Sequence, residues 1–171
     1  MSSEKEKVCC FTGHRTISAG DAEVLPELLY ETLCRLYADG VREFRTGGAV
    51  GFDTLAALSA IRLKNMHSDV KLRLMLPCRD QCSKWRPSNI KSYKEILAAA
   101  DSVEYVSLFY NENCMHLRNL QLVRGSDYCV CYKRKGVGGG AAFTVRKAEE
   151  ENLEIINLLD LIEGRRQNIT V

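Results

Sequence analysis

The sequence predicts a single α/β domain in which helices cover both faces of a doubly wound, mostly parallel sheet. The chain has 171 residues, which fits one domain of about 100–200 residues. Apolar residues make up 46% of the chain and charged residues 27%, as in ordinary globular proteins. Strand-like and helix-like patterns alternate about six times, with no internal repeat or flexible linker between them. Such alternation implies right-handed crossovers between parallel strands.

The chain is expected to begin with a short buried strand at residues 7–12, whose sequence is KVCCFT. A helix is expected at 21–39, because its leucines form one apolar stripe at helical spacing. Ser18 and Asp21 have the spacing of a capping box at the start of this helix. Gly40 is a suitable residue to end it.

The middle of the chain continues the alternation. Residues 42–46 (REFRT) form a second short strand candidate, and residues 52–65 are rich in helix-forming residues. Residues 70–76 alternate between polar and apolar and stop at Pro77, which indicates a third strand. A helix is expected at 89–100, where the apolar residues share one face.

The last part of the chain completes the series. Residues 102–106 (SVEYV) form a weak strand candidate, and residues 115–124 a short helix. The sequence DYCVCY at 127–132 is a clear strand. A helix is expected at 140–150 after a run of glycines, and a last strand at 154–158.

The domain is expected to span residues 1–171, with its core at about 7–158. The tail from about Asp160 is polar, so we expect it to fray. Lys and Arg total 24 against 22 Asp and Glu, a net charge of +2. Global charge therefore does not favour a nucleic-acid partner, and any anion site must be local.

The N-terminal sequence MSSEKEKV is charged and lacks the apolar core of a signal peptide. The longest apolar runs are far below the roughly 18 residues that span a membrane. We therefore expect a cytoplasmic protein without a membrane partner. The eight cysteines are expected to be reduced thiols, mostly buried in strands. Cys78 and Cys82 have loose metal-like spacing without a second pair of ligands, so no metal is expected.

Two glycine-rich turns lead from a predicted strand to a predicted helix. They are TGGAVG at 46–51 and the run from Gly136 to Gly140. Neither is a Walker A motif nor a G-x-G-x-x-G motif. Each would let the backbone approach a ligand closely, and the following helix would offer its free N–H groups to an anion. Because parallel strands place their carboxyl ends at one sheet edge, the two loops predict a phosphate-bearing ligand there. A valine at Gly48 is accordingly expected to remove binding and leave the fold largely intact.

Other candidates lie in the same group of loops. Arg15 follows the first strand and could form a forked contact with a phosphate or carboxylate. Arg118 opens a helix, where its charge opposes the helix dipole, which favours a role toward a ligand. Trp85 could stack on a base or fasten its loop to the core. The basic run at 133–135 is expected to be a solvated loop.

Two residues are candidate proton shuttles. His14 could donate a proton or simply cap a loop, and Asp53 could act as an acid or stabilise the start of its helix. The catalytic candidates are therefore Asp53 and His14. The expected ligand-binding residues are Thr12, Gly13, His14, Arg15, Thr46, Gly47, Gly48, Gly51, Asp53, Trp85, Arg118, Asn119, Gly138, Gly139, Gly140 and Thr144.

These loops, taken together and in this order, resemble the YpsA-like branch of the SLOG superfamily. The matching stretches are CCFTGHR (9–15), TGGAVGFDTLAALSAIRLK (46–64), LRLMLPCRDQCSKW (72–85), CMHLRNLQLV (114–123), SDYCVCY (126–132) and GGGAAFTVRKA (138–148). The resemblance implies a Rossmann-like fold that binds a nucleotide or a nucleotide-derived ligand at the two glycine loops. The wider superfamily includes nucleotide-signal sensors, single-stranded DNA binders and phosphoribohydrolases.

One departure from the family pattern bears on activity. The LOG hydrolases carry a Pro-Gly-Gly-x-Gly-Thr-x-x-Glu loop with a catalytic acid. In this chain no carboxylate follows the second glycine loop until Glu149. The resemblance therefore favours a ligand-binding module or sensor for a nucleotide or an ADP-ribose-like molecule, with no cofactor required.

Two alternatives stay open. The first is a nucleoside-phosphate N-glycosidase that uses Asp53 or His14 as the proton shuttle. The second is a single-stranded DNA-binding protein, which would need a basic track with exposed aromatic residues. The near-neutral net charge disfavours the second alternative. Whether the chain catalyses a reaction and whether it forms a homo-oligomer are both left open.

Overall fold

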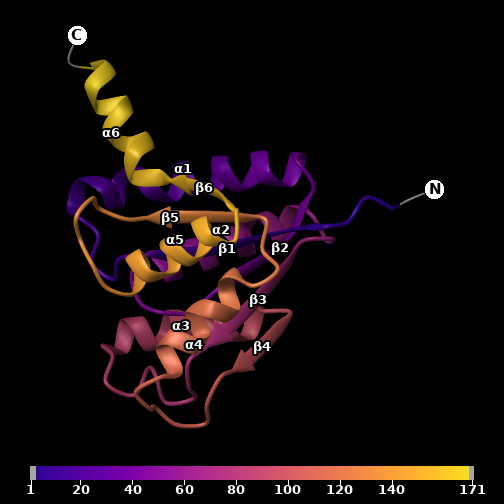
Figure 1. The fold of residues 1–171 in the computed structure, drawn as a ribbon, viewed down its shortest axis with the longest axis vertical. Coiled ribbons are helices and arrows are strands. Elements are labelled where there is room, and N and C mark those ends of the chain that lie inside the picture. The colour runs from indigo at the N-terminus through magenta and orange to yellow at the C-terminus, as the bar shows by residue number, and fades with distance from the viewer. Residues whose placement is uncertain (1–2, 170–171) are drawn as a thin grey trace.

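The computed structural model describes residues 3–169, and over these residues one six-stranded parallel sheet forms the centre of the molecule (Figure 1). The strand order is β4-β3-β2-β1-β5-β6, and every neighbouring pair is parallel. The strands are β1 (Lys7–Gly13), β2 (Val41–Thr46), β3 (Lys71–Leu76), β4 (Ser102–Tyr105), β5 (Tyr128–Tyr132) and β6 (Glu154–Asn157). The expected strands are therefore confirmed, with ends that shift by only a residue or so.

Helices cover both faces of this sheet, as a doubly wound fold requires. The helices are α1 (Ala19–Ala38), α2 (Phe52–Met66), α3 (Pro87–Ala99), α4 (Cys114–Val123), α5 (Gly140–Glu150) and α6 (Leu158–Ile169). Helices α1, α2, α3 and α6 pack together on one face, and α4 and α5 pack on the other. The Rossmann-like α/β architecture expected from the sequence is confirmed.

The start of α1 illustrates how the local sequence determines an element. The Ser18 hydroxyl accepts a hydrogen bond from the backbone N–H of Asp21 at 3.3 Å, which caps the helix. The Asp21 carboxylate does not complete a capping box. It accepts hydrogen bonds from the Tyr132 hydroxyl at 2.5 Å and from Arg166 at 2.6 Å instead. Asp21 thus ties the start of α1 to β5 and to the last helix.

The expectation of a frayed tail was wrong. Residues Leu158–Ile169 form α6, whose Leu158, Leu159 and Ile162 are buried against the α1 face of the sheet. The ion pair between Arg166 and Asp21 fastens the helix near its end. The polar composition of the exposed sides of α6 concealed a short apolar stripe, and the core therefore extends to Ile162.

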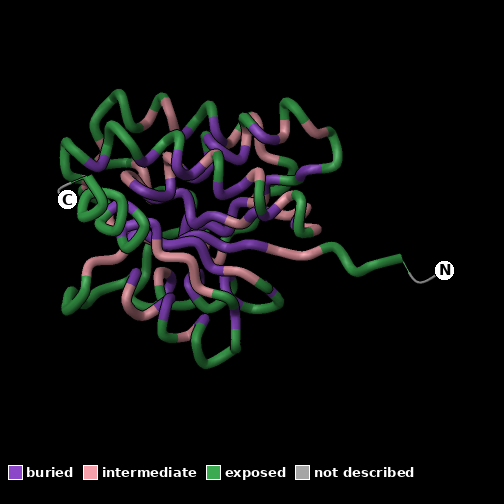
Figure 2. Tube along the Cα trace, turned by 90° about the horizontal axis from the view of Figure 1, so that it is seen from above, coloured by how far each residue is buried: buried purple, intermediate pink, exposed green. Residues whose placement is uncertain are grey.

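Buried residues follow the strands through the middle of the molecule, and exposed residues lie along the outer helices and loops (Figure 2). Six of the eight cysteines are buried: four lie in β1 and β5, as the strand patterns predicted, and Cys78 and Cys114 lie outside the strands, while Cys34 and Cys82 are partly exposed. Burial raises the pKa of the Cys131 thiol to about 12. Within residues 3–169, no helix is long and apolar enough to cross a membrane.

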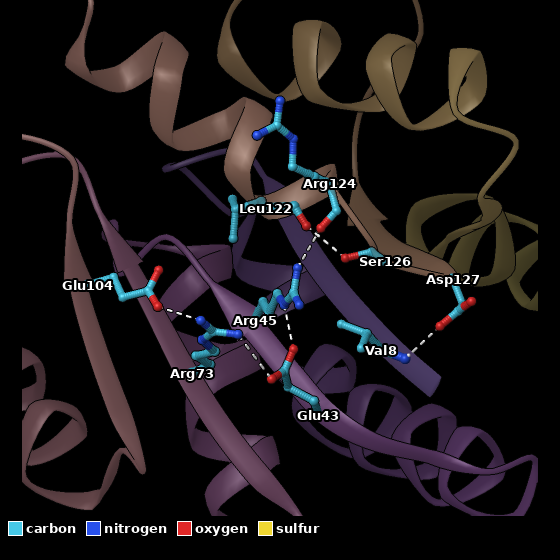
Figure 3. Close-up of polar contacts among 9 residues, drawn as sticks. All are labelled: Val8, Glu43, Arg45, Arg73, Glu104, Leu122, Arg124, Ser126 and Asp127. Atoms are coloured by element: carbon cyan, nitrogen blue, oxygen red, sulfur yellow. Dashed lines mark hydrogen bonds and ion pairs between the residues drawn. The ribbon is translucent and has the colours of Figure 1, made fainter. Parts of the chain in front are cut away.

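Charged side chains on the α4 side of β2, β3 and β4 pair with one another (Figure 3). Arg45 donates to Glu43 at 2.5 Å, and Arg73 pairs with both Glu43 and Glu104. Arg45 also donates to the carbonyl oxygen of Arg124 at 2.6 Å. These cations have carboxylate partners within the chain and need no external anion.

Candidate ligand-binding site

A cavity of about 350 Å³ opens where the carboxyl ends of β1 and β5 face the first turns of α4 and α5. The chain leaves β1 toward β2 and later returns to β5 on the other side of β1, so this is the topological switch point of the sheet. The lining residues are Phe11, Thr12, Gly13, His14, Arg15, Ala49, Asp53, Met115, Arg118, Asn119, Leu122, Gly138, Gly140 and Ala141. Candidates from three distant parts of the sequence therefore meet in one cavity.

The start of α5 forms one wall of the cavity. Its N-cap residue is Gly139, with φ +101°, and no side chain caps the helix. A Cβ atom added at Gly138 or Gly139 would meet no heavy atom within 4 Å. The free N–H groups and the positive end of the α5 dipole therefore face open space, which is the arrangement that binds anions.

Arg118 lies on the opposite wall and is only 6% exposed. Its Nη1 donates to the carbonyl oxygen of Gly47 at 2.5 Å, and its Nε donates to Asn119 Oδ1 at 2.7 Å. Burial lowers its pKa, and the charge of Asp53 partly opposes this effect. Within the described residues no carboxylate lies within 4.0 Å of the guanidinium, so this buried cation has no ion-pair partner.

Asn119 is 8% exposed and its amide has a defined orientation. Because its Oδ1 accepts from Arg118, its Nδ2 is the group that approaches Gly140, at 3.6 Å from the position of a Cβ atom there. No group in residues 3–169 accepts a hydrogen bond from this Nδ2. The amide therefore adds an unpaired donor that is not fully buried, beside the start of α5.

The glycines of the first glycine loop lie against other segments of the chain. A Cβ atom at Gly47 would collide with the Arg118 guanidinium, and one at Gly51 would collide with the backbone of Arg15. At Gly48, where φ is +70°, a Cβ atom would lie 2.5 Å from Leu76 Cδ2. These glycines make room for protein atoms, and none of them lines the cavity, so their expected contact with a ligand stays a prediction.

Asp53 holds the same loop in place. Its Oδ2 accepts a hydrogen bond from the backbone N–H of Ala49 at 3.1 Å. The carboxyl group is largely buried at the cavity wall, and this burial raises its pKa, while Arg118 and Arg15 lower it. Asp53 thus combines its expected role at the start of α2 with a place beside the cavity.

His14 joins the loop after β1 to the basic run that follows β5. Its Nε2 accepts a hydrogen bond from the backbone N–H of Arg134 at 2.9 Å. Burial, together with the charges of Arg134 and Lys133, lowers the pKa of the imidazole. The neutral form that makes this bond is therefore favoured, and the basic run lies against the cavity loop and His14. Arg15 is exposed at the cavity itself.

Four other candidates lie outside the cavity lining: Gly139, which is the N-cap of α5, and Thr46, Thr144 and Trp85. Thr46 Oγ1 lies 3.5 Å from both the backbone N–H of Gly48 and the Asp53 carbonyl oxygen. Thr144 Oγ1 donates to the carbonyl oxygen of Gly140 at 2.9 Å, within its own helix. Trp85 packs edge-to-face against Tyr93 at 5.3 Å and fastens its loop to the core.

Sequence reasoning missed the apolar part of the lining: Phe11, Ala49, Met115, Leu122 and Ala141. The helical spacing of Met115, Arg118 and Leu122 places them on one face of α4, and this spacing was the available signal. Within residues 3–169, no three His, Cys, Asp or Glu side chains gather where they could hold a metal ion.

A parallel sheet with a cavity of ligand size at its switch point defines a Rossmann-like protein. The model of the YpsA family, described as the YspA SLOG family, matches residues 9–163, and the chain belongs to this family. This confirms the resemblance seen in the sequence.

Curated relatives include UPF0398 proteins of bacteria. One from Halalkalibacterium halodurans is 28% identical over 71% of this chain and 69% of its own length. One from Bacillus cereus strain B4264 is 23% identical over 95% of this chain and 98% of its own length.

Two solved structures share the fold. DNA processing protein A from Helicobacter pylori, described with a single-stranded DNA binding mode, superposes with a TM-score of 0.60 at 18% identity, over 87% of this chain. This chain spans 63% of the length of that protein. The structural-genomics target TM1055 superposes with a TM-score of 0.57 at 16% identity, over 91% of this chain and 79% of its own.

Proposed function

We propose that the cavity between β1 and β5 binds a nucleotide or a nucleotide-derived molecule such as ADP-ribose through its phosphate. The observation that carries this proposal is Arg118, a buried guanidinium at the cavity that feels the charge of Asp53 but has no carboxylate within 4.0 Å among the described residues. A buried charge is costly unless it is closely paired, and an anionic ligand would supply a direct ion-pair contact that Asp53 does not make.

The surrounding groups fit the same ligand. The phosphate would accept hydrogen bonds from the first N–H groups of α5 and from Asn119 Nδ2, beside Arg118. The apolar side chains of Phe11, Met115 and Leu122 would contact the sugar or base. Membership of the SLOG family supports a nucleotide-binding module, and a cytoplasmic setting suits its free cysteines.

Thermal unfolding with AMP, ADP-ribose and unphosphorylated adenosine tests this function. A ligand at 100 times its dissociation constant stabilises the folded chain by about 2.7 kcal/mol. We expect stabilisation by the two phosphate-bearing molecules and little by adenosine. Stabilisation by adenosine equal to that by AMP, or by none of the three, would contradict the proposal.

A matched pair of variants locates the binding. Gly138→Asp places a carboxylate at the cavity wall, where an added side chain meets open space, and is expected to repel the phosphate. Gly164→Asp adds the same charge on α6, also into open space, and is expected to bind like the wild type. Equal ligand stabilisation of both variants would place the ligand elsewhere.

A second candidate function is cleavage of the N-glycosidic bond of the bound nucleotide. The observation that favours it is Asp53, whose buried carboxyl lines the cavity and has a raised pKa, as a proton donor requires. In Asp53→Asn the amide oxygen can still accept from Ala49, so the fold should persist.

Release of free base, followed by chromatography, separates the two functions. If the chain is an enzyme, Asp53→Asn should reduce turnover by about 10²–10⁴-fold while affinity is retained. If the chain only binds, the wild type should release no base, and Asp53→Asn should change the binding free energy by about 0.3–1 kcal/mol.

A further inference from the structure

We infer that the loop from Val106 to Asn113 is a base-stacking platform, with which the chain binds single-stranded nucleic acid whose phosphate occupies the cavity. This inference rests on the proposed function of the cavity and adds the class of ligand. The loop joins β4 to α4, and it presents the largest group of consecutive exposed apolar side chains in residues 3–169.

The aromatic side chains of this loop extend into water. Phe109 is 73% exposed and Tyr110 is 66% exposed, and Leu108 beside them is also exposed. Such consecutive exposure of large apolar side chains is unfavourable in water and commonly marks a binding surface. The π-face of a nucleic-acid base is a suitable partner, because every base can stack on an aromatic ring.

Hydrogen bonds hold the loop in one conformation. The backbone N–H of Arg79 donates to the carbonyl oxygen of Leu108 at 3.2 Å. The backbone N–H of Tyr110 donates to Asp80 Oδ1 at 3.1 Å, and the Ser107 hydroxyl donates to the carbonyl oxygen of Phe109 at 2.7 Å. The aromatic residues are therefore presented by a structured loop, which limits the entropy cost when a base stacks on them.

Several cations without an ion-pair partner lie in loops at the same end of the sheet as the platform. Arg79, Lys84 and Arg86 are exposed in the loop after β3, and none of them forms an ion pair within the described residues. Arg15 and Lys135 are likewise exposed, whereas Lys133 and Arg134 are partly buried, and none of these four forms an ion pair within the described residues. The paired arginines of Figure 3 show that cations elsewhere on the sheet do have carboxylate partners.

These loops share one edge of the molecule, because all the strands are parallel and each loop follows a strand. The platform leads directly into α4, whose Met115, Arg118 and Asn119 line the cavity. A single strand of nucleic acid that is held in the cavity by one phosphate can therefore continue past the start of α4 to the aromatic loop. A net charge of only +2 is compatible with binding of a nucleic-acid strand, because the cations without ion-pair partners lie together at this edge.

The ligand must be single-stranded. In a duplex the bases stack on one another, so their faces are not available to Phe109 and Tyr110. The loops at this edge therefore combine exposed basic residues with the exposed aromatic residues Phe109 and Tyr110, as a single-strand binding surface requires. The sequence alone did not show how these residues are arranged in space.

The test measures fluorescence anisotropy of a labelled oligothymidylate of about 16 nucleotides, within the site sizes known for such surfaces. The double variant Phe109→Ala with Tyr110→Ala should weaken its binding by about 10-fold or more, because stacking on at least one base is removed. The variant with tryptophan at both positions should bind at least as well as the wild type. AMP affinity should be unchanged in both variants.

Salt dependence provides a second readout. Replacement of Arg79 and Arg86 by alanine should lower the slope of log affinity against log salt by about 0.7 for each phosphate that these side chains neutralise in the wild type. A double-stranded oligonucleotide of the same length should compete poorly with the single strand.

Several results would overturn the inference. One such result is that the wild type does not bind the oligonucleotide. Another is that the wild type and the double alanine variant bind it with equal affinity. A third is conversion of a dimer to a monomer by the alanine changes with oligonucleotide affinity unaltered, because the loop would then be a subunit contact. Absence of AMP binding, with oligonucleotide binding still dependent on Phe109, would instead contradict the cavity's proposed function alone.

Discussion

The glycines of the loops at 46–51 and 136–140 have different structural roles in the folded chain. Gly47, Gly48 and Gly51 let distant protein atoms approach, whereas an added Cβ atom at Gly138 or Gly139 meets only open space. The first group stabilises the loop that Arg118 and Asp53 fasten, and the second group leaves the end of α5 accessible. Glycine thus allows close packing in the loop that supports the cavity and leaves the cavity open at the start of α5.

This difference predicts a difference in stability. Gly48→Ala places a side chain at φ +70° and 2.5 Å from Leu76 Cδ2, so it should destabilise the fold by about 1–3 kcal/mol. Gly138→Ala has ordinary φ and open space, and should change stability little. Urea unfolding of both variants measures this difference, and wild-type stability of Gly48→Ala would show that the loop accommodates a side chain.

The imidazole of His14 predicts a dependence on pH. Its pKa in the folded chain lies below the ordinary value of 6.5, because burial and the charges of Arg134 and Lys133 disfavour the cation. As pH falls through 6.5, the unfolded chain takes up a proton before the folded chain does, so stability falls with pH in that window. An NMR titration should give a His14 midpoint below 6.5, and a midpoint above it would contradict the placement of Arg134.

At the scale of the element, α6 shows how a helix with mostly polar residues can still belong to the core. Its buried face consists of Leu158, Leu159 and Ile162, and Asp21 anchors it through Arg166. Ile162→Ala should therefore destabilise the fold by about 2–5 kcal/mol, while Leu161→Ala, at an exposed position, should cost much less. Equal, small effects of both changes would mean that α6 is not packed against the core.

The elements and their order could be predicted because strands and helices differ in the period of their apolar residues. The helix α6 escaped prediction because its stripe is short and charged residues surround it. The roles of the glycines could not be predicted, because their neighbours Leu76, Arg118 and Arg15 come from other segments of the chain. The contact between His14 and Arg134 was equally hidden, because it joins two loops that only the pairing of β1 with β5 brings together.

At the scale of the whole molecule, the strand order explains why one site exists. The strand order changes direction at β1, because β2 to β4 lie on one side of it and β5 and β6 on the other. The carboxyl ends of β1 and β5 are therefore neighbours, and helices α4 and α5 enclose the space above them. Residues around positions 14, 118 and 139 meet there, although they are far apart in the sequence. Their backbone and side-chain donors converge on one small volume, which no single motif could have indicated.

The central claim is that a phosphate binds between the start of α5 and the Arg118–Asn119 pair. A titration of isotopically labelled protein with AMP, followed by amide NMR, tests it most directly. We expect the largest shifts at the backbone amides of Gly138, Gly139 and Gly140 and at the side-chain amide of Asn119. Shifts confined to the loop at 46–51, or no shift at the start of α5 under saturating AMP, would contradict the account.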